Sequence, residues 1–374
     1  MIRLSKSVIG IEEKKAVLGV LDREFLGMGK EVGLFEKELS NLFSREAVCV
    51  SSGTAAIQLA IEACNIGPGH EVIVPSLTYV ATFQAITATG AKPIACDVYD
   101  DTCLLNIEDA KSKLTKNTKA IIPVHYTGGV GDLEALYKFA HENNLRVIED
   151  AAHAFGTKYN SKLIGSFGDI ACFSFDGIKN ITSGEGGCII SDDKLVIANL
   201  KNSRLLGVER DSDKRYINKR SWDFDVTRQG WRYHMSNIMA AIGIEQLKKM
   251  EFFAIKRKKI ARSYDQELKS NPLIRPLERD YDNVVPHIYV VRINNLKNRD
   301  KLKEVMYEKG IELGIHYNPN HYLTFFKSNN NFKLPSTEKI YKEIISLPIH
   351  PDITQQDVKF VISTLNKLLP NYIK

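Results

Sequence analysis

From about residue 46 to 190, short apolar runs alternate with longer stretches whose apolar residues recur at helical spacing. Short apolar runs bounded by turn residues are typical of buried strands. The predicted strands are Ala47–Val50, Glu71–Val74, Pro93–Asp97, Ala120–Val124 and Arg146–Glu149. Helical patterns such as Ala55–Cys64 and Leu133–Asn143 lie between them. This alternation predicts an α/β fold with a parallel sheet covered on both faces, and ligands bind such sheets at the carboxyl ends of the strands.

The second part of the chain has its own α/β pattern. A helical pattern runs from Ile238 to about Leu268, and we interpret it as a helix that connects two domains. A strand at His287–Ile293 and a helix at Arg299–Lys309 follow. The last predicted helix extends from Thr354 to about Leu369, with Thr354 as its cap. A chain of 374 residues is too long for one ordinary core, so we expect a large domain over residues 1–250 and a smaller one over 251–374.

Charge and composition exclude several classes of protein. The net charge of +6 comes from basic residues scattered among acidic ones, which argues against a nucleic-acid-binding surface. No apolar run reaches the ~18–20 residues that a membrane span needs, and the N-terminus lacks the pattern of a signal peptide. We therefore expect a cytoplasmic protein. The six cysteines form no C-x-x-C pair, which predicts free thiols and no structural metal.

A candidate phosphate site follows the first predicted strand. The sequence Ser51-Ser52-Gly53-Thr54-Ala55-Ala56 leads from a strand into a helix. Free backbone N–H groups at a helix N-terminus, with hydroxyl groups beside them, bind phosphate well. The alternative is an ordinary helix cap.

An acidic residue ends another buried strand, in the sequence Val147-Ile148-Glu149-Asp150-Ala151-Ala152-His153. A carboxylate in such a place needs a cationic or hydrogen-bonded partner, and a protonated pyridine nitrogen would be one. The alternative is that Asp150 caps the next turn and that His153 is a core histidine.

The most specific signal is a lysine in a turn between an aromatic strand and a glycine-rich strand start. Lys179 follows Phe173-Ser174-Phe175 and precedes Gly184-Glu185-Gly186-Gly187. We expect it to be ringed by hydroxyl groups (Ser174, Thr182, Ser183) rather than by carboxylates. A buried lysine with a lowered pKa is the usual residue that forms a Schiff base. The alternative is a surface lysine in a loop.

Further blocks of sequence extend this pattern over nearly the whole chain. They are Phe25–Gly29, Pro75–Thr82, Gly230–Asn237, His316–His321 and Ser346–Pro351. Together with the three elements above, they resemble the sugar-nucleotide aminotransferase family (the DegT/StrS group) of fold-type I pyridoxal-phosphate enzymes. The resemblance implies a large domain with a mostly parallel, seven-stranded sheet between helices and a smaller C-terminal α/β domain. It also implies that about the first 15 residues pack on the small domain.

The resemblance implies a role for each matching residue, with pyridoxal 5′-phosphate as cofactor and no metal. Lys179 and Asp150 match the catalytic pair, Lys179 as the Schiff-base lysine and Asp150 as the partner of the pyridine nitrogen. The other cofactor positions are Gly53, Thr54 and Ser174 at the phosphate, Tyr79 on the ring face, and His153 beside the ring hydroxyl. Arg232 stands where the family has an Asn or sometimes a Lys that reaches the phosphate in the neighbouring subunit, and His234 replaces a common Arg or Asn. His316, Tyr317 and His321 match a substrate-side loop.

The resemblance also implies a substrate and an assembly. Asn180–Gly187 and Trp222–Met235 are similar to enzymes that aminate carbon 4 of a keto-sugar nucleotide, with L-glutamate as amino donor, for amino-sugar and surface-glycan synthesis. Amination at carbon 3 or of an amino-cyclitol precursor is the alternative. Relatives that became dehydratases lost the lysine, so Lys179 argues against that activity. The alternative outside the enzymes is a non-catalytic regulator with the same fold. A homodimer with shared active sites is expected.

Overall fold

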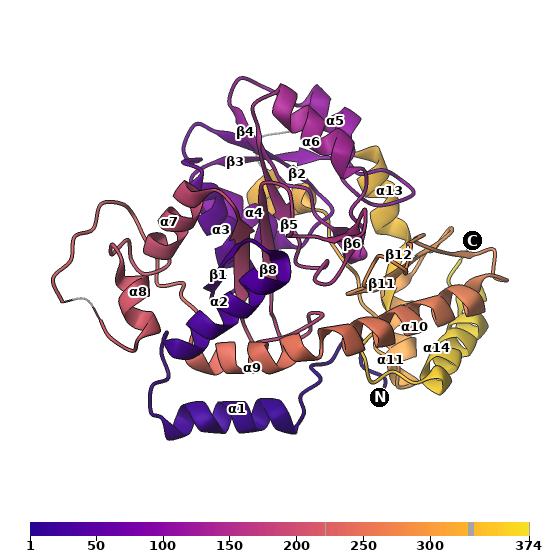
Figure 1. The fold of residues 1–374 in the computed structure, drawn as a ribbon. Coiled ribbons are helices and arrows are strands. Elements are labelled where there is room, and N and C mark those ends of the chain that lie inside the picture. The colour runs from indigo at the N-terminus through magenta and orange to yellow at the C-terminus, as the bar shows by residue number, and fades with distance from the viewer. Residues whose placement is uncertain (221, 328–332, 374) are drawn as a thin grey trace.

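The main sheet has seven strands in the order β1-β9-β8-β5-β4-β2-β3 (Figure 1). The computed structural model describes residues 1–220, 222–327 and 333–373. Strand β9 runs antiparallel to both of its neighbours, and the pairs from β8 across to β3 are parallel. The predicted, mostly parallel sheet is therefore confirmed. Its strands are β1 (Glu46–Val50), β2 (Glu71–Pro75), β3 (Lys92–Cys96), β4 (Thr118–Ile121), β5 (Arg146–Asp150), β8 (Ile170–Ser174) and β9 (Gly187–Ser191).

Helices cover both faces of this sheet because its strands are apolar on both sides. Val147 of β5 belongs to one hydrophobic cluster and its neighbour Ile148 to another, as expected where successive side chains point to opposite faces. The helices of this part are α1 (Ile11–Asp22), α2 (Lys30–Phe43), α3 (Gly53–Ala63), α4 (Val80–Ala88), α5 (Ile107–Ser112), α6 (Leu133–Glu142), α7 (Lys194–Ser203), α8 (Asp211–Tyr216) and α9 (Asn237–Lys248). A short hairpin joins β6 (Lys158–Tyr159) and β7 (Lys162–Leu163).

The C-terminal part is built on a three-stranded antiparallel sheet with its own core. Its strands are β10 (Ile274–Pro276), β11 (Tyr289–Ile293) and β12 (Ile344–Leu347), and its helices are α10 (Met250–Leu268), α11 (Arg299–Glu308), α12 (Thr324–Lys327), α13 (Pro335–Glu343) and α14 (Gln355–Leu368). Short 3-10 turns lie at Tyr126–Gly128, Asn320–Tyr322 and Leu369–Asn371. The predicted cap of α14 is confirmed, because the Thr354 hydroxyl accepts from Asp357 N at 3.1 Å and the Asp357 carboxylate accepts from Thr354 N at 2.9 Å.

One prediction about the helices was wrong. A single helix was expected from Ile238 to about Leu268, but α9 ends at Lys248 and α10 begins at Met250. Lys249 leaves the helical conformation, and its ammonium group donates to Glu12 at 3.0 Å and to Glu13 at 2.7 Å on α1. This break lets α9 pack on α1 and α2 while α10 crosses to the second sheet (Figure 1). The acids that Lys249 contacts lie far away in sequence, so the local pattern could not reveal these contacts.

The extreme N-terminus lies on the C-terminal part of the structure. Ile2 forms a β-bridge with Ile311, and Leu4 N donates to Glu312 at 3.0 Å. Ile349 N in turn donates to Leu4 O at 3.0 Å. The chain then crosses back, so that α1 packs on α9.

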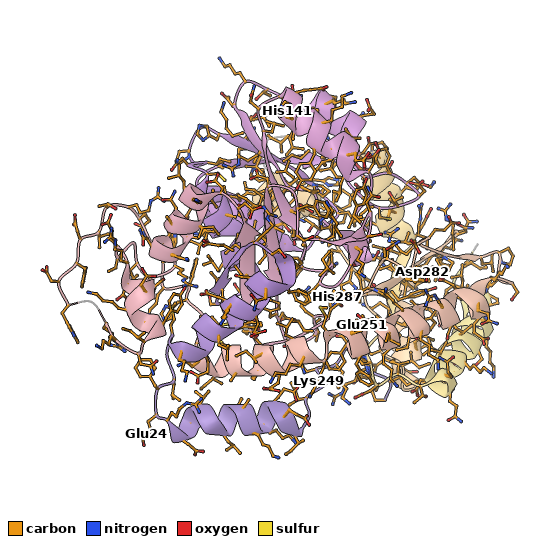
Figure 2. All side chains as sticks on the ribbon, viewed as in Figure 1. Glu24, His141, Lys249, Glu251, Asp282 and His287 are labelled. Atoms are coloured by element: carbon orange, nitrogen blue, oxygen red, sulfur yellow. The ribbon has the colours of Figure 1, made fainter. Side chains whose placement is uncertain are left out.

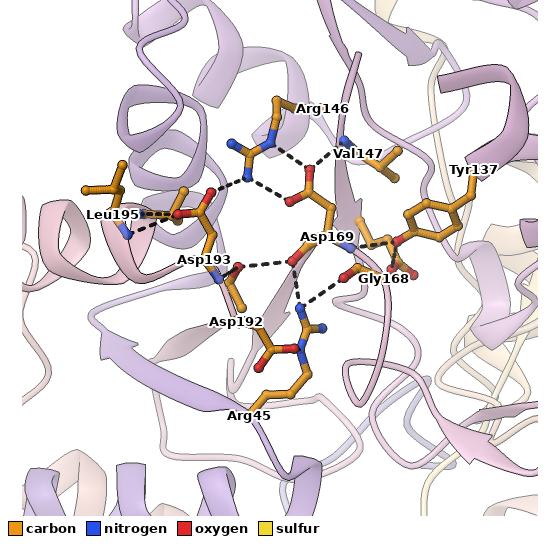
Figure 3. Close-up of polar contacts among 12 residues, drawn as sticks. Arg45, Tyr137, Arg146, Val147, Gly168, Asp169, Asp192, Asp193 and Leu195 are labelled. Atoms are coloured by element: carbon orange, nitrogen blue, oxygen red, sulfur yellow. Dashed lines mark hydrogen bonds and ion pairs between the residues drawn. The ribbon is translucent and has the colours of Figure 1, made fainter. Parts of the chain in front are cut away.

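A network of ion pairs fixes the amino-terminal edge of the main sheet (Figure 3). Arg146, at the start of β5, donates to both carboxylate oxygens of Asp169 at 2.8 and 2.7 Å and lies 3.2 Å from Asp193. Arg45, just before β1, pairs with Asp192 at 2.8 Å. These charges compensate one another at the edge opposite the carboxyl ends of the parallel strands.

Two further predictions concern the cysteines and membrane-spanning segments. All six cysteines are free thiols, as predicted. Among the helices in the described part of the chain, none is long and apolar enough to cross a membrane.

Candidate active site

A cavity of about 450 Å³ opens at the carboxyl ends of β5 and β8, where α3 begins. The main-sheet part supplies most of its wall, and the C-terminal part closes one side. A larger cavity of about 710 Å³ lies between α5 and α6. The smaller cavity is lined by Ser52, Gly53, Thr54, Ile57, Thr78, Tyr79, Ala81, Thr82, Val124, Asp150, Ala152, His153, Ser174, Asp176, Ile178, Lys179, Glu185, His287, His316 and Tyr317.

The first turn of α3 forms one end of this cavity. The Ser52 hydroxyl caps the helix by accepting from Ala55 N at 3.1 Å. Gly53 packs so closely on β8 that a Cβ atom there would lie 2.8 Å from Ser174 Cβ. Because a helix N-terminus attracts anions, this turn and the Ser174 hydroxyl make a site suited to phosphate.

Asp150 ends β5 and is buried, with 6% of its surface exposed. Its carboxylate accepts from the Thr82 hydroxyl at 2.8 Å and from Ala152 N at 3.2 Å. Burial raises the pKa of Asp150, and these hydrogen bonds act in the opposite direction. A carboxyl group held in this way would gain from a cationic partner in the cavity.

Lys179 lies in the turn between β8 and β9, and its Nζ is 3.3 Å from His287 Nε2. Removal from water lowers the pKa of Lys179 to about 8, although the charges of Asp150 and Asp176 act in the opposite direction. The expectation that hydroxyl groups rather than carboxylates surround this lysine was therefore wrong. Asp176 is only three positions away, but Asp150 reaches the site through the β5–β8 pairing. The lowered pKa gives the amine an appreciable neutral fraction near neutral pH.

Aromatic and imidazole rings form another part of the cavity wall. His153 Nε2 lies 3.0 Å from the Tyr317 hydroxyl, and the His153 ring centroid is 4.5 Å from that of His287. Tyr79 contacts Tyr317 at 5.4 Å between centroids and is 58% exposed. Burial lowers the pKa of His153 and of His287 well below the usual range, which makes both rings neutral at neutral pH.

Two of the predicted site residues lie outside this lining in the described part of the chain. Arg232 bridges Leu205 in a segment that runs beside the end of β1, where Ser51 N donates to Tyr233 O at 2.7 Å. His321 Nδ1 lies 2.7 Å from Ser76 Oγ. The cavity brings together the other predicted residues, which are Gly53, Thr54, Tyr79, Asp150, His153, Ser174, Lys179, His316 and Tyr317.

The lining also contains polar residues that sequence reasoning assigned no role: Thr82, Asp176, Glu185 and His287. Thr82 could have been found, because it lies one helical turn after Tyr79 on α4. His287 gave no local signal. It was predicted as the first residue of a strand that in fact begins at Tyr289, and it is 108 residues from Lys179 in sequence.

A lysine of lowered pKa facing a buried aspartate, with a phosphate-binding helix terminus beside them, is typical of pyridoxal-phosphate enzymes. The sequence profile of the DegT/DnrJ/EryC1/StrS aminotransferase family matches residues 7–366. This chain therefore belongs to that family and is an aminotransferase, with pyridoxal 5′-phosphate as its cofactor.

Relatives resemble the chain over nearly its whole length. An uncharacterized protein of Methanocaldococcus jannaschii is 37% identical over 369 residues, which is 96% of each chain. The putative sugar aminotransferase Spr1654 of Streptococcus pneumoniae, in its PMP form, superposes with a TM-score of 0.90 at 28% identity, covering 99% of this chain and 98% of the other. Helicobacter pylori PseC, an aminotransferase of pseudoaminic acid biosynthesis, gives 0.90 at 27% identity, covering 99% and 100%. The predicted fold class is thus confirmed at the level of the whole chain.

The residues of the cavity fit this cofactor. A Cβ at position 53 would fill the space beside Ser174 that a phosphate needs, and the sequence has glycine there. His153 Nδ1 is buried without a hydrogen-bond partner among the described residues. The hydroxyl group on the cofactor ring could supply that partner. Asp150, buried and without an ion-pair partner among the described residues, offers a countercharge for a protonated ring nitrogen.

We expect Gly53→Ala to weaken cofactor binding by about tenfold or more, because the added methyl group displaces the Ser174 side chain from the phosphate site. The measurement is a titration of the cofactor-free protein with pyridoxal phosphate, followed by absorbance.

Gly27→Ala is the matched control, because no atom lies within 4 Å of the methyl group it would add. It should bind the cofactor as the parent does. Equal affinities of Gly53→Ala and the parent would show that this turn does not bind the phosphate.

Proposed function

We propose that this enzyme transfers the amino group of L-glutamate to carbon 4 of an NDP-4-keto-6-deoxyhexose, in the cytoplasm, for amino-sugar and surface-glycan synthesis. The observation that carries the transamination chemistry is the partly neutral Lys179 amine in the same cavity as buried Asp150. Support for a sugar substrate comes from the full-length likeness to proteins described as sugar aminotransferases, Spr1654 among them. The alternatives to this substrate are a carbon-3 keto-sugar nucleotide and the keto precursor of an amino-cyclitol.

The residues of the chain have separable tasks in this proposal. The cofactor, when bound, supplies an electron sink for the substrate carbon. The first turn of α3 and Ser174 would bind its phosphate, and Asp150 would hold the positive charge of its ring nitrogen. Lys179 would then act as a base and an acid that moves a proton to and from the reacting carbon. The neutral rings of His153 and Tyr317 would orient the cofactor and keep water from one side.

The preference for carbon 4 rests on the sequence from Asn180 to Gly187. Glu185 from this segment lines the cavity near Asp176, and burial raises the pKa of its carboxyl group. Its position at the cavity wall is suited to a hydrogen bond with a sugar hydroxyl. The position of Glu185 in the cavity lining supports the proposal that this segment contributes to the choice of sugar substrate.

The test of this function is incubation of the loaded enzyme with keto-sugar nucleotides and glutamate, with the products identified by mass and NMR. We expect a 4-amino-6-deoxy product, formed with one equivalent of 2-oxoglutarate, because each transfer consumes one glutamate. A matched panel of 3-keto sugars and a keto-cyclitol serves as the comparison. Faster amination of either of these would replace the carbon-4 proposal.

A second prediction concerns Asp150. Asp150→Asn keeps the shape of the side chain but removes the charge that would hold a proton on the ring nitrogen, so turnover should fall by about 10²-fold or more. Cofactor affinity should change less, since the phosphate contacts at α3 remain.

Occupancy and rate must be measured on the same sample of this variant. An Asn variant that is fully loaded and turns over at the parent rate would mean that Asp150 only caps the turn to Ala152.

We further propose a homodimer with shared active sites. Lys179 is the one lysine or arginine in the lining of the cavity within the described residues, whereas Asp150, Asp176 and Glu185 are acidic. A cofactor phosphate and a nucleotide diphosphate need more positive charge than this. A second copy of the chain, presenting Arg232, would supply it, and closed two-fold assemblies are the commonest oligomers.

Mixing of two inactive variants tests this sharing. After subunit exchange, Lys179→Ala with Arg232→Ala should recover up to roughly one quarter of the parent activity, since half of the dimers are mixed and each has one intact site. The measurement is turnover of the mixture, with exchange verified by mass spectrometry of tagged chains.

The matched control mixes Lys179→Ala with Asp150→Asn, whose lesions fall in the same cavity of each chain. At every ratio, that mixture should turn over no faster than Asp150→Asn alone. An exchanged Lys179→Ala and Arg232→Ala mixture that stayed inactive would contradict the shared site.

A further inference from the structure

Arg257 of α10 is buried, and among the described residues it has no carboxylate partner. Its side chain is 1% exposed, and Nη1 donates to three backbone carbonyls, those of Pro286 at 3.5 Å, His287 at 3.0 Å and Ile349 at 3.4 Å. Its Nε has no hydrogen-bond partner in the part of the chain that the structure describes. Burial lowers the pKa of Arg257 to about 10.

The other fully buried arginines differ from Arg257 in this respect. Arg204 forms an ion pair with Glu36, and Arg292 pairs with Asp100 at 3.1 Å and Glu343 at 2.6 Å. Burial alone would lower the pKa of both guanidinium groups, but the carboxylates outweigh it and the pKa values are raised. Within the residues that the structure describes, no acid forms an ion pair with Arg257 to compensate its positive charge.

An uncompensated buried charge is a poor way to stabilise a fold. Removing it from water costs free energy that a few carbonyl contacts only partly offset, and an apolar side chain of similar size is often neutral or stabilising. The charge of Arg257 is therefore expected to act on something nearby. One of its carbonyl partners belongs to His287, the residue that contacts Lys179.

The contacts form a continuous chain from α10 to the cavity. Arg257 donates a hydrogen bond to the backbone carbonyl of His287. Nε2 of the His287 ring lies 3.3 Å from Lys179 Nζ. The same ring contacts the His153 ring in a tilted arrangement, with an interplanar angle of 48°. Figure 2 shows His287 beside the junction of α9 and α10, between the two parts of the molecule.

We propose that Arg257 is a positioning residue for Lys179: its contact with the His287 carbonyl holds the imidazole against Nζ, and its positive charge disfavours protonation of the lysine amine. This inference rests on Lys179 being the cofactor lysine, as proposed above. It adds a reason why the amine stays reactive although Asp150 lines the same cavity.

The balance of charge at Lys179 sets the direction of the effect. The carboxylates raise the pKa of the lysine, and the guanidinium lowers it, as does removal from water. The neighbouring imidazoles are neutral because burial lowers their pKa values, and Lys179 itself adds to this. The groups that act on Lys179 or face it are Asp150, Asp176, Arg257, His153, His287 and His316.

The experiment measures how readily the amine of the cofactor-free protein reacts with an aldehyde at different pH values. Only the neutral amine attacks the carbonyl carbon of pyridoxal phosphate, forming a C=N bond and releasing one water, so the rate constant rises with pH to a plateau. Its midpoint reports the protonation of Lys179. The same aldehyde is used with every variant, so its own titration cancels in the comparison.

Arg257→Met should move this midpoint upward by at least about half a pH unit, which is about a threefold lower rate constant below the midpoint. Arg257→Lys keeps the charge and should stay within about 0.2 units of the parent. Arg292→Met is the matched control, because it removes a buried guanidinium that is paired with two acids, Asp100 and Glu343, and that forms no hydrogen bond or ion pair with His287 or Lys179 among the described residues. It should lower thermal stability without moving the midpoint.

Several results would overturn the proposal. A folded Arg257→Met protein with the parent midpoint would assign Arg257 a structural role only. Failure of Arg257→Met to fold would do the same, because the proposal holds that the charge is not required for stability. A reaction that persists unchanged in Lys179→Ala would instead remove the assignment of Lys179, a separate failure that the same assay distinguishes.

Discussion

The parallel pairing of β5 with β8 is the constraint on which the site depends. Its register places Asp150 opposite Cys172, so both strands end at the same edge of the sheet. The end of β5 therefore supplies the buried carboxyl group, and the end of β8 supplies Ser174 and the turn that carries Lys179. Strand β1 joins the same edge through β9, with Val50 opposite Gly187, and this places the first turn of α3 beside Ser174. A shift of one residue between β5 and β8 would turn the side chain of Asp150 to the other face.

The second sheet completes the site rather than forming a separate unit of function. His287, His316 and Tyr317 all come from the C-terminal part, and they close the cavity over residues that the main sheet presents. The Lys179 amine thus has carboxylates on the side of the main sheet and imidazole with buried guanidinium on the other. The protonation of this amine depends on how the two parts are packed together.

Charges are distributed differently at the two edges of the main sheet. At the amino-terminal edge, Arg45 and Arg146 meet Asp192 and Asp169 in direct ion pairs. At the carboxyl edge, Asp150 is held by a hydroxyl and an amide instead of a cation. The first arrangement fixes the ends of strands. The second leaves a carboxyl group able to respond to a charge brought by a ligand, which a permanent ion pair would prevent.

The sequence alone determined those strands and helix ends that depend on residues close together in the chain. Alternating apolar runs predicted the strands and the parallel sheet, and Thr354 with Asp357 predicted the start of α14. Ser52, Asp150 and Lys179 each follow a strand, so their convergence at one edge of the sheet could be predicted once the strands were known to be parallel. Tertiary structure decided the rest, because the physical causes lie far apart in the chain. The acids that contact Lys249 between α9 and α10 belong to α1, and the imidazole at Lys179 belongs to a segment 108 residues away. Burial, the proximity of Asp150 and the charge of Arg257 all act on the pKa of Lys179. The proximity of Asp150 needs only the pairing of β5 with β8, whereas the contacts of Lys179 with His287 and of His287 with Arg257 exist only after the two sheets have packed together.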